Sequence, residues 1–112
     1  MTTASANQCW EEEVSVARRH FEALIARLPE NLRQEASAIE CRFQKRCDDP
    51  DAQDTMGGYR RSAHRISLYL HAIEEHCRNE GRDYLRELET TFLHELGHHL
   101  GLEEGDLEKR GL

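Results

Sequence analysis

Two histidines and a glutamate near the end of the chain have the types and spacing that could do chemistry: His94-Glu95-Leu96-Gly97-His98. Residues four apart lie on one face of a helix, so the imidazoles of His94 and His98 could bind one zinc ion. Glu95 lies one step round the helix, where its carboxylate can reach a water molecule on that ion. Zinc lowers the pKa of its water toward about 7. The motif therefore predicts hydrolysis of a carbonyl compound, with Glu95 taking the proton as general base and passing it to the leaving amine.

The residues after this motif supply a candidate third metal ligand. Gly101 lets the chain turn sharply back toward the two histidines, and Glu104 follows three residues later. An oxygen of Glu104 would complete three protein ligands and leave the fourth position for water, as a catalytic zinc site requires. Glu103 is an alternative because the register is ambiguous by one residue, and Asp106 is a less favoured donor.

A helix must carry the motif and hold it away from the core. The pattern predicts a helix capped by Asp83 and running to about residue 100, where Gly101 suits the left-handed residue that ends a helix. Its apolar stripe consists of Leu85, Leu88, Phe92 and Leu96. At about 100° per residue, His94 and His98 fall opposite that stripe, so they are not core histidines. The remaining alternative is a pair of solvent-facing polar side chains. His99 falls near the edge of the stripe, which indicates packing or support of the site.

The first third of the chain is predicted to be mostly helical. Apolar residues recur at spacings of three and four between Glu11 and Leu28, which indicates an amphipathic helix packed on the core. Pro29 stops this pattern, and a short helical turn is expected near residues 30–36. Residues 1–8 are expected to be flexible.

Alternating polar and apolar residues predict a small sheet. Residues 39–44 alternate as a half-buried strand does, and residues 56–61 and 65–70 indicate a hairpin with a tight connection at residues 62–64. A short helix is expected over residues 71–79. Together these elements predict one α+β domain over residues 1–112, with an N-terminal helix, a two- to three-stranded sheet and a C-terminal active-site helix.

Composition limits the size of the core and the class of partner. Hydrophobic residues make up 38% of the 112 residues, charged residues 33%, and the net charge is −7. So acidic a surface disfavours nucleic acid and anionic membranes, and no apolar run approaches the roughly 20 residues of a membrane span. The N-terminus shows no secretory signal pattern, and the four cysteines form no CxxC pair. We therefore expect reduced thiols and a cytoplasmic protein.

The chain resembles the small bacterial zincin-like metallopeptidases, also called minimal zincins. The resemblance covers nearly the whole chain and is most specific in the segment from Thr91 to Leu102. The other matching segments are 21–30, 39–47, 56–59 and 65–69. It implies a compact α+β core with a small sheet beside the active-site helix. It also implies zinc on His94 and His98, Glu95 as the base and an acidic third ligand. That ligand is usually aspartate in the family, whereas position 104 here is glutamate.

The function expected from these residues is a zinc-dependent metallopeptidase that acts on a peptide or protein. A peptide could dock along an exposed strand edge, for which residues 65–70 are the expected strand. Only 8 residues follow Glu104 in this sequence, so we expect an open cleft and modest activity. The alternatives are a zinc-binding domain without turnover, with a structural or partner-binding role, and hydrolysis of some other bond, such as a small amide. The pattern leaves the oligomeric state open.

Overall fold

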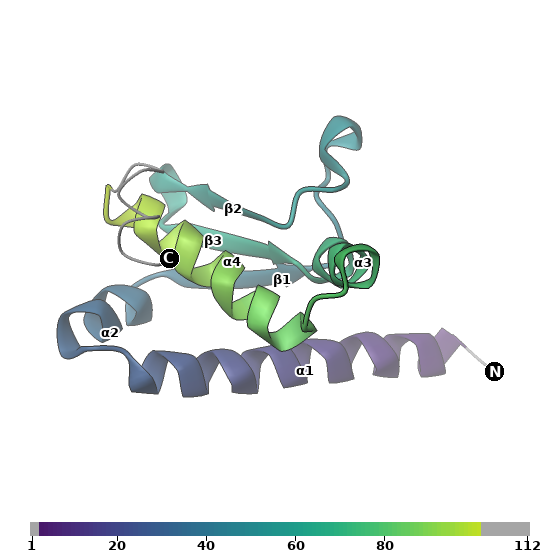
Figure 1. Ribbon diagram of the computed structural model, residues 1–112, viewed down its shortest axis with the longest axis horizontal. Helices are drawn as coiled ribbons and strands as arrows, with labels where there is room; N and C mark the ends of the chain where they lie inside the picture. The colour runs from purple at the N-terminus through teal and green to yellow at the C-terminus, as the bar shows by residue number, and fades with distance from the viewer. Residues whose placement is uncertain (1–2, 102–112) are drawn as a thin grey trace.

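The computed structural model describes residues 3–101, which form the α+β fold that the sequence predicts. Four α-helices pack against one another and against a three-stranded sheet in this part of the chain, and the outer edge of β2 is left uncovered by them (Figure 1). In chain order the elements are α1 (Thr3–Arg27), α2 (Glu30–Ser37), β1 (Glu40–Gln44), the 3-10 turn η1 (Pro50–Ala52), β2 (Gly57–Arg60), the 3-10 turn η2 (Arg61–Ala63), β3 (Arg65–Tyr69), α3 (Leu70–Glu80) and α4 (Tyr84–His99).

The first helix is longer than its apolar pattern indicated. We predicted a start at Glu11, but α1 begins at Thr3. The segment from Thr3 to Gln8 contains no large apolar residue, so hydrophobic periodicity carries no signal there. The predicted end near Leu28 is confirmed, and α2 follows directly after Pro29.

The sheet has the strand order β1-β3-β2. The predicted hairpin is confirmed, because β2 and β3 pair antiparallel, with Gly57 opposite Leu68 and Tyr59 opposite Ile66. On its other side β3 pairs with β1 in parallel. β3 is thus the central strand, and our expectation that residues 65–70 offer an exposed edge is wrong. The edges among the described residues belong to β1 and β2.

The core lies between the sheet, α1 and α4. α4 packs against β2, β3, α1 and α3, while α1 runs along the far side of α4 from β2 (Figure 1). Ile66 and Leu68 of the central strand are fully buried, and the rings of Phe21 and Phe92 meet edge to face with centroids 4.0 Å apart. The predicted stripe of α4 faces this core: Leu88, Phe92 and Leu96 are buried and Leu85 is partly buried.

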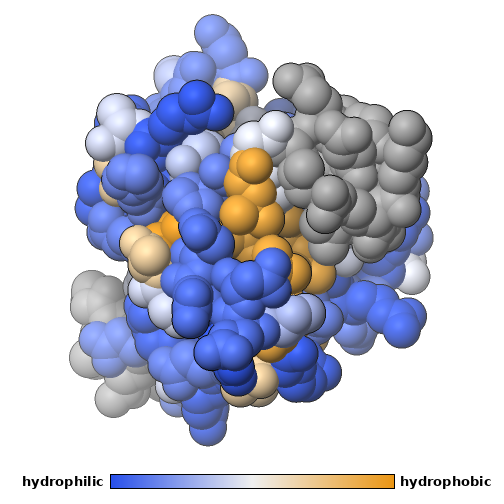
Figure 2. All heavy atoms as spheres, turned by 90° about the vertical axis from the view of Figure 1, so that its left-hand side faces the viewer, coloured by the Kyte–Doolittle hydropathy of each residue, from blue (hydrophilic) through white to orange (hydrophobic). Residues whose placement is uncertain are grey.

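The surface is mostly hydrophilic, as the charge content implies. Figure 2 looks at the end of the molecule where α2 and the C-terminal end of α4 lie, and it shows one band of hydrophobic side chains among hydrophilic ones. None of the helices in residues 3–101 has the length and apolar character to cross a membrane. All four cysteines are free thiols.

Candidate active site

The helix that carries the motif is defined at both ends. The side chain of Asp83 accepts a hydrogen bond from the backbone N–H of Arg86 at 3.0 Å, which caps the first turn of α4 as predicted. The helix ends at His99, and Gly101 takes the predicted left-handed conformation, with φ 79°. α4 therefore ends directly after the motif.

His94 and His98 lie together on one face of α4, as their spacing predicts. Their ring centroids are 4.9 Å apart and their planes are inclined by 81°. Both side chains are half-buried, whereas the apolar stripe of the same helix is buried in the core. Two adjacent imidazoles at partial exposure are a donor set that suits a divalent metal such as zinc. The residues therefore fit the metal centre that the motif implies.

Glu95 is buried, with 9% of its surface exposed, and it lies next to Gly57 of β2. A Cβ atom added to Gly57 would be 2.7 Å from Cγ2 of Thr91 and 3.5 Å from Cγ of Glu95. Only glycine fits such a short distance between strand backbone and helix. The backbone of β2 is thereby brought against the carboxylate-bearing side of the helix. We did not predict this role of Gly57 from the sequence. A glycine inside a predicted strand was the signal that could have indicated a close approach of the backbone.

An open cavity lies beside Glu95, between β2 and the first half of α4. Its volume is about 290 Å³, and its walls are formed by Met56, Gly57, Glu87, Thr90, Thr91, His94 and Glu95. The cavity thus brings together one predicted metal ligand, the predicted base and an edge strand of the sheet. A substrate bound along β2 could place a side chain here.

His99 ties the end of the motif to two other elements. Its Nδ1 atom is 2.8 Å from the hydroxyl oxygen of Tyr59 on β2, and its Nε2 atom is 3.1 Å from a carboxylate oxygen of Glu35 on α2. In the arrangement that satisfies both bonds, the Tyr59 hydroxyl donates to Nδ1 and Nε2–H donates to Glu35. His99 is 13% exposed. Of the two roles expected for His99, packing and support of the site, these contacts show packing, and support of the site stays a prediction.

The candidate third ligands lie outside the described residues. Glu104, with Glu103 and Asp106 as alternatives, follows residue 101, where the described part of the chain ends. Their part in a metal site therefore stays a prediction from the sequence.

A family model described as zincin-like metallopeptidase matches residues 46–112, which is more than half of the chain and includes β2, β3, α3 and the α4 motif. No curated protein and no solved structure matches the chain.

Proposed function

Because the chain belongs to the zincin-like metallopeptidase family, we propose that it is a zinc-dependent hydrolase of peptide bonds. One observation carries this proposal. His94 and His98 share one face of α4, and the neighbouring Glu95 is buried at the contact with the edge strand β2. A pair of imidazoles beside a carboxylate at the mouth of a cavity is the arrangement that metal-assisted hydrolysis requires.

Each residue of the motif has a separate task in this proposal. His94 and His98 would hold the ion together with an acidic residue of the C-terminal segment, for which Glu104 is the candidate. Zinc, when bound, would acidify a water molecule and polarise the substrate carbonyl. Glu95 would accept the proton of the attacking water and deliver it to the leaving amine. The close contact with β2 restricts the Glu95 side chain, so that little conformational freedom is lost when it acts.

The peptide would bind along β2. This strand pairs on one side only within the described residues, so its other edge can accept main-chain hydrogen bonds from an extended peptide. β2 packs directly on α4, which would bring the peptide backbone beside Glu95. The cavity lined by Met56, Thr90 and Thr91 would then take a substrate side chain.

The replacement Glu95→Gln tests the proposal because it removes the base and keeps the shape of the side chain. We expect zinc-loaded wild type to cleave members of a peptide library and Glu95→Gln to lose at least about 100-fold in rate, with its zinc content unchanged. Glu89→Gln is the matched control, because Glu89 lies on the same helix but pairs with His20 on α1. Equal cleavage by wild type and Glu95→Gln would exclude this mechanism. Retention of zinc without any cleavage would favour a binding or structural role.

A further inference from the structure

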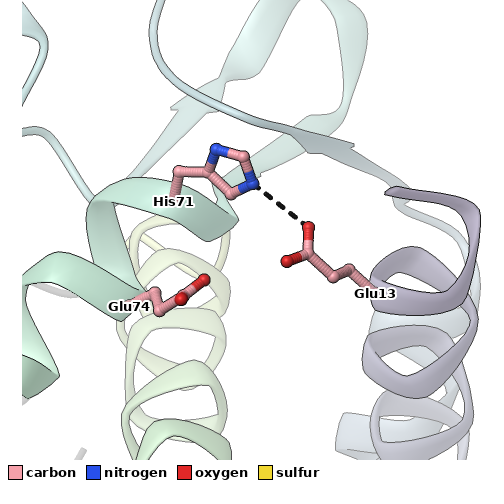
Figure 3. A group of neighbouring side chains, drawn as sticks. All are labelled: Glu13, His71 and Glu74. Carbon is pink, nitrogen blue, oxygen red and sulfur yellow. Dashed lines mark hydrogen bonds and ion pairs between the residues drawn. The ribbon is translucent and has the colours of Figure 1, made fainter. Parts of the chain in front are cut away.

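A second group of metal-binding side chains lies between α1 and α3. Glu13 comes from α1, whereas His71 and Glu74 come from α3, and all three side chains point into the same space (Figure 3). One ligand atom from each residue lies within 4.8 Å of the others, and Nε2 of His71 is 3.1 Å from a carboxylate oxygen of Glu13. Ligand atoms around a tetrahedral zinc are roughly 3.4 Å apart, given bonds of about 2.0–2.1 Å. The three ligand atoms must therefore move closer together to bind an ion, and the side chains that carry them are only partly buried.

The fold holds His71 in the orientation that such a site needs. Its backbone N–H donates to the carbonyl of Lys45 at 3.0 Å, which fixes the start of α3. The ring of Trp10 packs edge-on against the imidazole, with centroids 5.6 Å apart. Nε2 is thereby directed at Glu13, and Glu74, three residues later, lies on the same face of α3.

The surroundings of the group favour a cation. An open cavity of about 580 Å³ is lined by Glu13, Glu74 and Tyr84, among others. Burial raises the pKa of Tyr84 to about 12, and the negative charges of Glu13 and Glu74 add to this rise. The negative charges of the two carboxylates thus lie close to each other beside Tyr84. A divalent ion bound between them would relieve their repulsion.

Two arginines lie near the group, but they compete only weakly with a metal ion for its carboxylates. Arg46 is engaged elsewhere, because it donates to the carbonyl of Gln53 and pairs with Glu75. Arg78 is 3.9 Å from Glu74, but its side chain is 70% exposed. An exposed pair of this kind contributes little, so an incoming ion can displace Arg78 from Glu74.

The chemistry of the donors selects the class of ion. Cys9 lies one helical turn before Glu13 on α1 and lines the same cavity as Glu13 and Glu74. The imidazole of His71 beside two carboxylates suits zinc, whereas calcium and magnesium prefer oxygen ligands alone. We propose that Glu13, His71 and Glu74 form a second zinc site, made of residues other than the α4 motif, which joins α1 to α3.

Trp10 provides a direct readout of this site. It is the single tryptophan of the chain and touches His71, so zinc at His71 should change its fluorescence. The experiment titrates zinc into the full chain carrying His94→Ala and His98→Ala, which removes the α4 motif. We expect a saturable fluorescence change and close to one zinc ion per chain by equilibrium dialysis. Adding His71→Asn or Glu74→Gln should weaken binding at least about tenfold.

The controls separate ligand loss from general damage. His76→Asn changes another histidine of α3, and Glu22→Gln changes an exposed glutamate elsewhere on α1, so both should leave zinc binding intact. Arg78→Ala should tighten binding, because it removes the cation that competes for Glu74. If the motif-free chain does not fold, the same comparison is made in the wild-type chain, where His71→Asn should bind one zinc ion fewer than His76→Asn.

Two results would overturn the proposal: no zinc bound by the folded motif-free chain, or equal affinity with and without His71→Asn. The site would then be only an ion pair between α1 and α3. Neither result bears on the peptidase proposal, because the motif-free protein lacks the residues on which that proposal rests.

Discussion

Burial suppresses ionisation of Cys41 and Tyr84, and this has a consequence for stability. Burial raises the pKa of the Cys41 thiol from 9.0 to about 12, against the opposing charge of Arg18, and it raises the pKa of Tyr84 from 10.0 to about 12. Above about pH 9 the unfolded chain loses these protons while the folded chain keeps them. The stabilisation is therefore complete below these ordinary pKa values and is lost as the pH rises toward 12.

Urea unfolding in the alkaline range measures this effect. The free energy of unfolding should fall above about pH 9, by at most about 1.4 kcal/mol per pH unit for each group. Cys41→Ala should make the fall shallower between about pH 9 and 10, whereas Cys9→Ala, at an exposed position, should not. The same slope in Cys41→Ala and wild type would show that Cys41 has an ordinary pKa in the folded protein.

Among single residues, the sequence predicted the chemistry better than the supporting contacts. The positions of His94 and His98 on one face follow from helix geometry alone, and the structure has them so. The contacts that hold the end of α4 join residues 40 and 64 positions apart in the chain, namely Tyr59 with His99 and Glu35 with His99. No local pattern reveals such pairs. Glu104 lies outside the described residues, so its role as a ligand stays a prediction from the sequence.

At the scale of elements, the contact between β2 and α4 sets the shape of the candidate site. Gly57→Ala would place a methyl carbon 2.7 Å from Cγ2 of Thr91, so the strand must move away from the helix. We expect Gly57→Ala to lower peptide hydrolysis and to destabilise the fold by about 1–3 kcal/mol. Gly58→Ala is the matched control, because the nearest atom to its added carbon is the Tyr69 hydroxyl at 3.9 Å.

A second replacement separates this contact from a general effect of alanine. Thr91→Ser removes the methyl group that would collide and keeps the hydroxyl that donates to the carbonyl of Glu87 at 2.8 Å. The double variant of Gly57→Ala with Thr91→Ser should therefore recover much of the lost activity and stability. Equal losses in the single and double variants would mean that Gly57 acts in another way.

Local patterns predicted the elements, but not all of their neighbours. The alternation in residues 65–70, with a short strand or extended segment expected at residues 56–61, was enough to predict the hairpin, because its strands are joined by a short connection. The parallel pairing of Glu40 with Arg65 and of Cys41 with Ile66 connects strands separated by two turns and another strand. Periodicity says nothing about such pairing. The expected docking edge was therefore assigned to β3, which the structure places in the centre of the sheet.

For the molecule as a whole, zinc should contribute strongly to stability. The core is small, because only 38% of the residues in the chain are hydrophobic. Both proposed zinc sites use side chains of the helices that enclose this core. An ion that binds only the folded chain stabilises it by about 2.7 kcal/mol at 100 times its dissociation constant. We expect a chelator to lower the melting temperature of the zinc-loaded protein, and to lower that of His94→Ala less. A melting temperature unaffected by the chelator would contradict this view of the fold.

The zinc content of the purified, reconstituted chain tests the proposed metal centre on the α4 motif most directly. His71→Asn serves as the parent, so that only the α4 motif is measured. We expect close to one zinc ion per chain in this parent, and much less when either His94→Ala or Glu104→Ala is added. No zinc in the parent, or equal zinc in all three proteins, would contradict a metal centre on the α4 motif and the peptidase function built on it.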